Sequence, residues 1–262
     1  MQIFVLNLDK DHARMDHMKS QLDNADLPYE RLRGVYGKEM SQAEWSTHYS
    51  IKKARWRRAR SLSPAEVGCS LSHLRAYREI VRRNLPFAFI LEDDAVISEN
   101  LEELLMHFEQ VLDPDESIAI LFSDAKVDTK SSTDLPLGLK LSPIRDAYYA
   151  SSYIITRGGA KALLADLYPV GDISDPWTRL MRYKVVDVRA ITPSLIPQDQ
   201  ETFGSSTTEG IKQVLGEHPL AIPLYRLRRV RAVLWDFVAS TFANPKAKLP
   251  REGDHPIDSL EK

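Results

Sequence analysis

One short apolar run constrains the fold more than any other part of the sequence. The run from Phe87 to Leu91 follows Pro86 and ends abruptly in Glu92, Asp93 and Asp94. A continuous apolar run of this length suits a strand with both faces buried, as in the centre of a helix-covered sheet. The chain is 43% hydrophobic and 27% charged, with a formal net charge of −2, so it can bury such a core. These values exclude disordered, collagen-like and transmembrane classes.

The rest of the sequence alternates predicted strands and helices. Ile3 to Leu8 reads as a buried strand, Asp11 to Asp26 as a helix and Leu27 to Val35 as a second strand, which is a β-α-β opening. Ser63 can cap the next helix, because Glu66 closes a capping box. Further predicted helices cover 64–84, 101–112 and 158–167, and further strands cover 118–122, 148–156 and 185–191, with a polar loop over 126–143. The pattern predicts an α/β fold with a mixed, mostly parallel Rossmann-type sheet flanked by helices.

The carboxyl ends of the first predicted strands gather polar side chains. Ligands of open α/β sheets bind beyond the carboxyl ends of the strands, which places Asn7, Asp9 and Arg14 at a candidate site. In an extended chain Glu92 and Asp94 point to one side, so both can face one ion. Carboxylate oxygens suit Mn²⁺ or Mg²⁺, and such an ion can neutralise a departing diphosphate. The alternative is a solvated turn, because Asp favours turns.

We expect one domain over residues 1–215 and a helical, basic C-terminal tail over 216–262. Residues 225–242 combine apolar side chains with the arginines of segment 226–231, which suits an amphipathic helix on a membrane surface or a helix packed on the domain. Residues 245–262 are polar and are expected to be loose. The single cysteine and the missing signal pattern predict a cytoplasmic protein, peripheral on the inner face of the cytoplasmic membrane.

A second basic segment covers residues 52–60, with six Lys and Arg side chains around Trp56. It predicts either a solvated helix face or mobile loop, or a surface for an anionic saccharide acceptor or an anionic membrane. Nucleic acid is not an expected partner, because the whole chain is slightly acidic and carries no nucleic-acid-binding module.

Four motifs follow one another in a fixed order over about residues 2 to 206. They are Phe4-Val5-Leu6-Asn7-Leu8-Asp9 with Arg14, Glu66-Val67-Gly68-Cys69-Ser70-Leu71-Ser72-His73, Leu91-Glu92-Asp93-Asp94-Ala95, and Tyr153-Ile154-Ile155-Thr156 with Gly159-Ala160-Lys161. The sequence resembles glycosyltransferase family 25, the lipopolysaccharide and lipooligosaccharide sugar transferases, whose members typically read E-x-G-C-x-x-S-H followed by L-E-D-D.

The resemblance implies a GT-A-like fold, a UDP-sugar donor, a divalent metal and inversion at the anomeric carbon. UDP-galactose is the donor that it suggests first. The implied metal contacts are Asp94 and Glu92, with Mn²⁺ or Mg²⁺ as the ion. The residues expected around the donor are Asn7, Asp9, Arg14, Ser72, His73, Glu92 and Asp93. Ser151 or Ser152 stands where the family usually has Gly, a departure that is expected to narrow the donor pocket.

Displacement of a sugar from a diphosphate also needs a base for the acceptor hydroxyl. Asp175 and Asp172 are both candidates, and the family's Pro-[Val/Ile]-Asp pattern does not decide between them. We expect a metal-dependent hexosyltransferase that acts on a lipooligosaccharide or related, often lipid-linked, glycan. A non-catalytic sugar-nucleotide-binding or glycan-binding protein is the alternative. A phosphoryl-transfer enzyme is disfavoured, because the sequence has no phosphate-binding glycine motif.

Overall fold

The computed structural model describes residues 1–98, 100–147, 149–199 and 255–261 of the 262-residue chain. The strands form a mixed sheet in the order β2-β1-β3-β8-β4-β9-β7-β5, and β6 pairs with β7. The strands are β1 (Gln2–Asn7), β2 (Glu30–Arg33), β3 (Phe87–Glu92), β4 (Ile118–Leu121), β5 (Ala125–Val127), β6 (Thr133–Asp134), β7 (Lys140–Ala147), β8 (Ser152–Thr156) and β9 (Asp187–Thr192). The predicted α/β class with a mixed sheet is confirmed.

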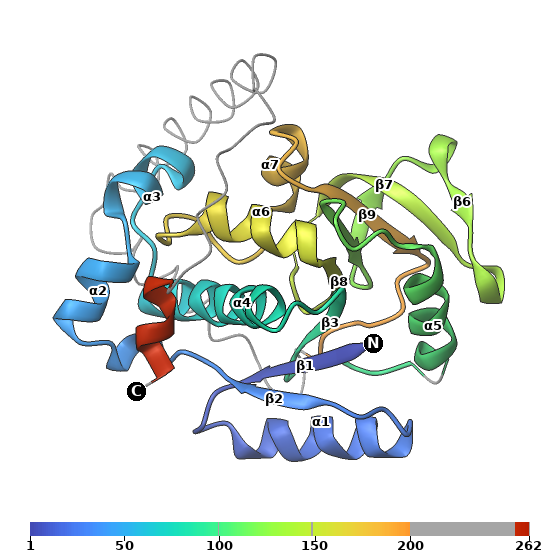
Figure 1. Ribbon diagram of the computed structural model, residues 1–262, viewed down its shortest axis with the longest axis horizontal. Coiled ribbons are helices and arrows are strands. Elements are labelled where there is room, and N and C mark those ends of the chain that lie inside the picture. The colour runs from blue at the N-terminus through green and yellow to red at the C-terminus, as the bar shows by residue number, and fades with distance from the viewer. Residues whose placement is uncertain (99, 148, 200–254, 262) are drawn as a thin grey trace.

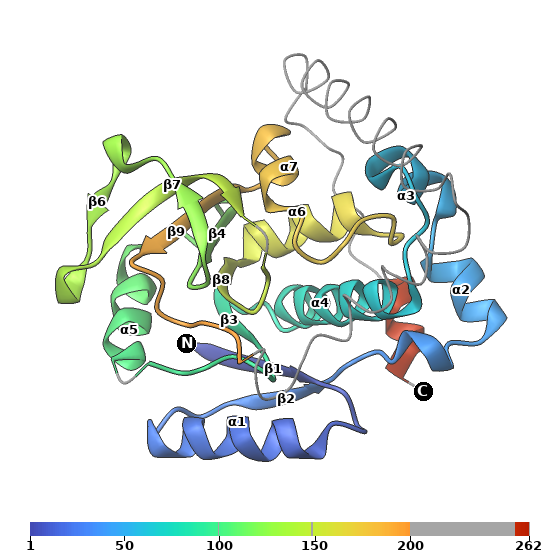
Figure 2. The ribbon, with the colours of Figure 1, turned by 180° about the vertical axis from the view of Figure 1, so that it is seen from behind.

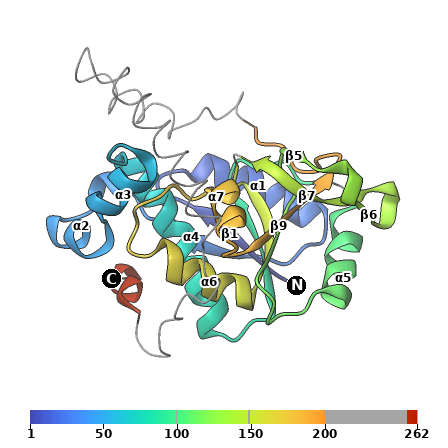
Figure 3. The same cartoon turned by 90° about the horizontal axis from the view of Figure 1, so that it is seen from above.

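Helices connect and cover these strands. The α-helices are α1 (His12–Asn24), α2 (Gln42–His48), α3 (Ile51–Arg58), α4 (Pro64–Arg82), α5 (Leu101–Val111), α6 (Arg157–Leu167) and α7 (Trp177–Arg182). Short 3₁₀ turns are η1 (Gly37–Glu39), η2 (Thr129–Ser131), η3 (Pro136–Gly138) and η4 (Pro256–Glu261). Figures 1 and 2 show α4 and α1 on opposite sides of β1. Figure 3 shows β6 at the end of the molecule opposite to α2 and α3.

The strand directions determine where the candidate site lies. Strand β1 pairs in parallel with β2 and β3, and β4 pairs in parallel with β9. Strand β8 lies between β3 and β4 and is antiparallel to both, so β3 and β4 run the same way. The carboxyl ends of these five strands, β1 to β4 and β9, therefore meet at one edge of the sheet.

The sheet separates two apolar cores. Ala88 and Ile90 of β3 pack in the core that contains the buried residues of α4, α6 and α7. Phe89 and Leu91 pack in the core that contains those of α1 and α5. Because side chains alternate along a strand, this pattern directs Glu92 towards α4 and the next residue towards α1.

The helix that follows Ser63 is formed as predicted. Pro64 occupies its first turn, and the capping box between Ser63 and Glu66 is present. Gly68 lies where α4 crosses the segment before η1, and a Cβ atom there would lie 2.4 Å from the Val35 carbonyl oxygen and 2.7 Å from the Gly37 nitrogen. The glycine of the Glu-Val-Gly-Cys motif therefore permits a backbone contact that places the rest of α4 beside β3.

We expect Gly68→Ala to lower the free energy of unfolding by about 2–3 kcal/mol, because both contacted atoms belong to the backbone and cannot turn away. Helix propensity alone would favour Ala over Gly by about 1 kcal/mol. Chemical denaturation of both proteins measures the difference. A stabilised Gly68→Ala variant would contradict the close approach.

Two expectations about other segments change. Residues 126–143 are not one continuous loop, because most of β5, all of β6 and the first half of β7 lie there as short, half-exposed strands paired near the sheet edge. Residues 255–261 are not loose: η4 packs on α2 and α4, Ile257 is buried, and Arg78 Nε donates a 2.9 Å hydrogen bond to Asp258. The predicted boundary at residue 215 and the basic segment 226–231 lie outside the described residues. Among the described helices, none has the length and apolar character needed to cross a membrane.

Candidate functional site

Residues at the end of β1 and just after β3 form a buried polar network at the carboxyl edge. Asn7 Nδ2 donates a 2.7 Å hydrogen bond to Asp93, and Arg14 Nη1 lies 3.2 Å from Asp93 and 3.5 Å from Asp94. Arg31 Nε donates to Asn7 Oδ1 at 2.8 Å, which orients the amide. Burial raises the pKa of Asp93 above its usual value, against the opposing effects of Asn7 and Arg14. The structure thus brings together three residues that the sequence placed at one site.

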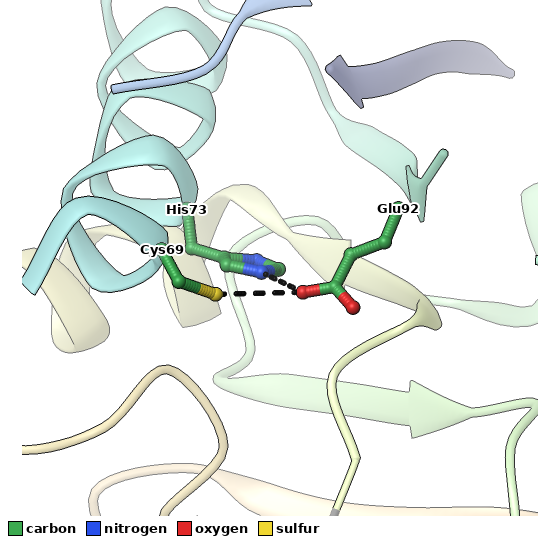
Figure 4. Close-up of side chains that lie close together, drawn as sticks. All are labelled: Cys69, His73 and Glu92. Carbon is green, nitrogen blue, oxygen red and sulfur yellow. Dashed lines mark hydrogen bonds and ion pairs between the residues drawn. The ribbon is translucent and has the colours of Figure 1, made fainter. Parts of the chain in front are cut away.

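On the other side of the sheet Glu92 meets α4. His73 Nε2 lies 3.0 Å from Glu92 Oε1, and His73 Nδ1 lies 2.7 Å from the Tyr153 hydroxyl, which in turn contacts Tyr77 at 2.7 Å. Cys69 donates a 3.5 Å hydrogen bond to the same carboxylate oxygen. Figure 4 shows Cys69 and His73 side by side on the helix with Glu92 reaching towards them. Burial opposes ionisation of Glu92, but the hydrogen bond and charge of His73, with smaller contributions from Cys69 and Arg14, together outweigh it and lower the pKa of this carboxyl.

Asp94 has the most strongly raised pKa of the acidic run. Burial and the neighbouring charges of Glu92 and Asp93 raise the pKa of Asp94 to about 7. Gln198 Nε2 donates to Glu92 Oε2 at 3.1 Å and lies 3.4 Å from Asp94 Oδ1, so one amide nitrogen lies between the two carboxylates. The carboxylates of the predicted Glu-x-Asp pair therefore face one common position, and the amide nitrogen of Gln198 lies beside it.

The two candidate bases have different surroundings. Asp172 is buried, accepts a 2.7 Å hydrogen bond from Arg179 Nε and lies 3.7 Å from Arg58. Asp175 is half-buried, and burial, with a further contribution from Glu92, raises the pKa of its carboxyl to about 7. Cys69 Sγ lies 3.3 Å from Ser174 Oγ as well as 3.5 Å from Glu92, which holds the segment before α7 beside the acidic run. Asp172 thus belongs to an internal ion network, while Asp175 has a pKa suited to proton transfer near neutrality.

Other predicted residues have contacts within the fold. Asp9 is exposed and pairs with Arg31 at 2.7 Å and also with Arg33. The Ser72 hydroxyl donates to Gly68 O and accepts from Val35 N, each at 2.8 Å, so it ties α4 to the segment after β2. The expected contact of Ser72 with the sugar-nucleotide donor stays a prediction. The structure also leaves the Ser151 hydroxyl fully buried with no hydrogen-bond partner among the described residues.

The basic segment 52–60 divides into internal and exposed side chains. Lys53 Nζ donates to the carbonyl oxygens of Asp166 and Pro169 at 2.7 and 2.9 Å, and Arg57 pairs with Asp166 at 3.0 Å. The prediction of a solvated helix face is therefore wrong for Lys53 and Arg57. Lys52 and Arg55 are exposed.

Sequence reasoning missed two residues of this site. Gln198 lies 106 residues from Glu92 in the chain, and no local pattern marks it. Tyr153 was recognised as part of a strand, but not as a partner of His73. The alternation of β8 is a signal for it, because Tyr153 and Ile155 share the face that packs against α4 and α6.

The model of the family described as Glycosyltransferase family 25 (LPS biosynthesis protein) matches residues 1–177. Among known proteins, procollagen galactosyltransferase 1-B of Xenopus laevis is 27% identical over 171 residues, covering 62% of this chain and 28% of that protein. Procollagen galactosyltransferase 1-A of Xenopus laevis is 29% identical over 173 residues, with the same coverage. Lipooligosaccharide biosynthesis protein lic2B of Haemophilus influenzae is 22% identical over 177 residues, covering 63% of this chain and 62% of that protein. The match to the two Xenopus proteins thus spans about a quarter of their length. Because the family model covers more than half of the sequence and includes the whole acidic run, the chain belongs to glycosyltransferase family 25.

Proposed function

We propose that this chain is a metal-dependent, inverting glycosyltransferase that moves a hexose, galactose first among the candidates, from a UDP-sugar to a lipooligosaccharide or related glycan. The observation that carries the proposal is the convergence of Glu92 and Asp94 on one position, with Asp175 held nearby through the contacts of Cys69. Family membership and the galactosyltransferase names of the relatives support the donor class.

The ligand atoms that Glu92 and Asp94 offer at this position suit a hard divalent cation. Glu92 and Asp94 offer carboxylate oxygens, and the raised pKa of Asp94 reflects negative charge that a cation would compensate. We assign Mn²⁺ or Mg²⁺ to these two residues. When bound, such an ion neutralises charge on the diphosphate as it leaves.

The remaining residues have separable tasks in this proposal. Arg14, positioned by Asp93, offers a guanidinium to the nucleotide diphosphate, and Asn7 holds Asp93 in place. Asp175 accepts the proton of the acceptor hydroxyl as that oxygen bonds to the anomeric carbon. The bond between the anomeric carbon and the UDP oxygen breaks on the opposite face, and the electron pair leaves with UDP. Attack from the face opposite the leaving group inverts the anomeric centre.

Equilibrium binding tests the proposed donor class without requiring turnover. Calorimetric titrations with UDP-galactose, UDP-glucose, UDP-N-acetylglucosamine and GDP-mannose, each with Mn²⁺ and with EDTA, should show binding of a UDP-sugar only with the metal. Equal binding with EDTA would contradict the metal assignment, and preference for GDP-mannose would contradict the donor class. Metal-dependent binding of a donor that is never hydrolysed or transferred would identify the non-catalytic alternative.

The exposed part of segment 52–60 is proposed as the surface for an anionic acceptor. We expect the double variant Lys52→Ala/Arg55→Ala to raise the acceptor KM about 30-fold, since each of the two cations contributes about 1 kcal/mol near an anionic surface. Hydrolysis of the donor without acceptor should not change. The matched control is Lys130→Ala/Lys140→Ala, which removes two exposed lysines at the other end of the molecule. Equal loss of both activities in the Lys52→Ala/Arg55→Ala variant would contradict an acceptor role.

The same exposed cations are compatible with attachment to an anionic membrane surface. We propose a cytoplasmic location, peripheral on the inner face of the cytoplasmic membrane, where a lipid-linked acceptor would be within reach. Sedimentation with vesicles that contain or lack anionic lipid tests this location, and equal recovery with both would contradict it.

A further inference from the structure

A group of three chemically different metal ligands lies beside the proposed catalytic cation. Cys69 and His73 are four residues apart on one face of α4, and Glu92 reaches them from the end of β3 (Figure 4). Their donor atoms, one sulfur, one nitrogen and one oxygen, lie within 4.8 Å of one another. We propose that Cys69, His73 and Glu92 form a second, zinc-selective metal site, called here the zinc site.

The two distances from Glu92 to the other ligands are close to those of tetrahedral zinc, and all three ligand atoms lie within 4.8 Å of one another. Zn–S bonds of about 2.3 Å and Zn–N or Zn–O bonds of about 2.0–2.1 Å place neighbouring ligand atoms about 3.3–3.6 Å apart. Glu92 Oε1 already lies 3.0 Å from His73 Nε2 and 3.5 Å from Cys69 Sγ. Three protein ligands leave the fourth position to water, as in zinc sites with one open position.

The surrounding hydrogen bonds hold the imidazole in the orientation that a metal requires. His73 Nδ1 lies 2.7 Å from the Tyr153 hydroxyl, and Tyr77 contacts the same hydroxyl at 2.7 Å. A ligating histidine ordinarily hydrogen-bonds through its second nitrogen in this way. On binding, the Cys69 thiol proton leaves to solvent and the neutral imidazole carries its proton on Nδ1, which frees Nε2 for the metal.

Ligand chemistry separates the zinc site from the Glu92–Asp94 position. A thiolate and an imidazole prefer Zn²⁺ to Mg²⁺ or Mn²⁺, whereas two carboxylates suit the latter ions. The sites share Glu92: Oε1 faces Cys69 and His73, and Oε2 faces Gln198, which also reaches Asp94. Two divalent cations on one carboxylate repel each other, so bound zinc should weaken Mn²⁺ binding. This inhibitory consequence rests on the proposed function, whereas zinc binding itself does not.

Cobalt(II) gives a direct test, because its thiolate complexes absorb by charge transfer and the chain has a single cysteine. Titration of the whole protein with Co²⁺ should produce this absorption with one equivalent, and Zn²⁺ should remove it. Cys69→Ser should lose the band, Asp94→Asn should keep it, and Tyr153→Phe should weaken zinc binding about 10- to 100-fold. No band in the folded wild-type protein would overturn the zinc site, as would loss of the band in Asp94→Asn.

Turnover gives the second readout. In the wild type, Zn²⁺ should raise the Mn²⁺ concentration for half-maximal UDP release at least 10-fold. In Cys69→Ser, measured against its own zinc-free Mn²⁺ dependence, this effect of zinc should be lost. Equal zinc inhibition of both proteins would overturn the inhibitory role. If the protein releases no UDP at all, the cobalt titration still tests the zinc site separately from the proposed function.

Discussion

Replacing Asp175 by Asn is expected to lower glycosyl transfer about 10²- to 10⁴-fold, the usual range for loss of a general base. The same change should raise the free energy of unfolding at pH 8. The pKa of Asp175 is about 7 in the folded protein against a reference value of 3.8. The unfolded chain therefore loses its proton first, and stability falls as the pH rises from about 4 to 7. Asn removes this penalty, which amounts to about 1–4 kcal/mol.

Asp172→Asn is the matched control, because it makes the same chemical change three residues away. Its carboxylate is 1% exposed and pairs with Arg179, so the change should lower the free energy of unfolding by about 2–4 kcal/mol. Denaturation at pH 5 and pH 8, together with transfer rates, separates the two aspartates. Stabilisation by Asp175→Asn should be larger at pH 8 than at pH 5. Destabilisation by Asp175→Asn with normal activity would contradict its assignment as the base.

The wild-type transfer rate should follow the same ionisation. A base with a pKa of about 7 is protonated and inactive in acid, so kcat/KM should rise with pH and level off above about 7. The raised pKa of Asp94 acts in the same direction, because a cation binds its ionised form. Measuring the profile at saturating Mn²⁺ reduces the contribution of Asp94. A profile that is flat between pH 5 and 8 at saturating Mn²⁺ would contradict the assignment of Asp175 as the base.

Asp94→Ala is expected to lower metal-supported turnover about 10²- to 10³-fold while leaving the fold intact. Burial and two neighbouring carboxylates already disfavour the charge of Asp94, so its removal should leave the melting temperature unchanged or higher. Asp134→Ala, which removes an 89% exposed carboxylate on β6, is the control and should change neither quantity. Near-normal Mn²⁺-dependent turnover in Asp94→Ala would contradict the metal assignment.

The central strands could be predicted because their signals are local. Phe87 to Leu91 is uniformly apolar, and Ser63 with Glu66 marks the start of α4 in the sequence itself. The alternation of β3 also predicted that Glu92 and Asp93 would point to opposite sides, which the contacts with His73 and Arg14 confirm. Where one face of an element is buried along its length, pattern and structure agree.

The edge of the sheet could not be predicted in the same way. Strand β7 contains Pro143, which ordinarily argues against a strand, and its partner β9 lies more than 40 residues later in the chain. The strands on the other side of β7 leave a gap at the proline, because β6 pairs with Lys140 and Leu141 and β5 pairs with β7 only from Ile144 onwards. Gln198 was likewise beyond pattern reasoning, because its contacts are made by distant residues. The sequence named Asp172 as a candidate base, but no local pattern showed that it is buried and paired with Arg179.

The most direct test of the account is UDP release from UDP-galactose by the wild-type protein with no acceptor, measured first with Mn²⁺ and then after addition of EDTA. The account predicts slow release that stops with EDTA and resumes when Mn²⁺ is restored in excess, because Glu92 and Asp94 hold the ion that compensates the diphosphate charge. Release that continues unchanged in EDTA would contradict this assignment.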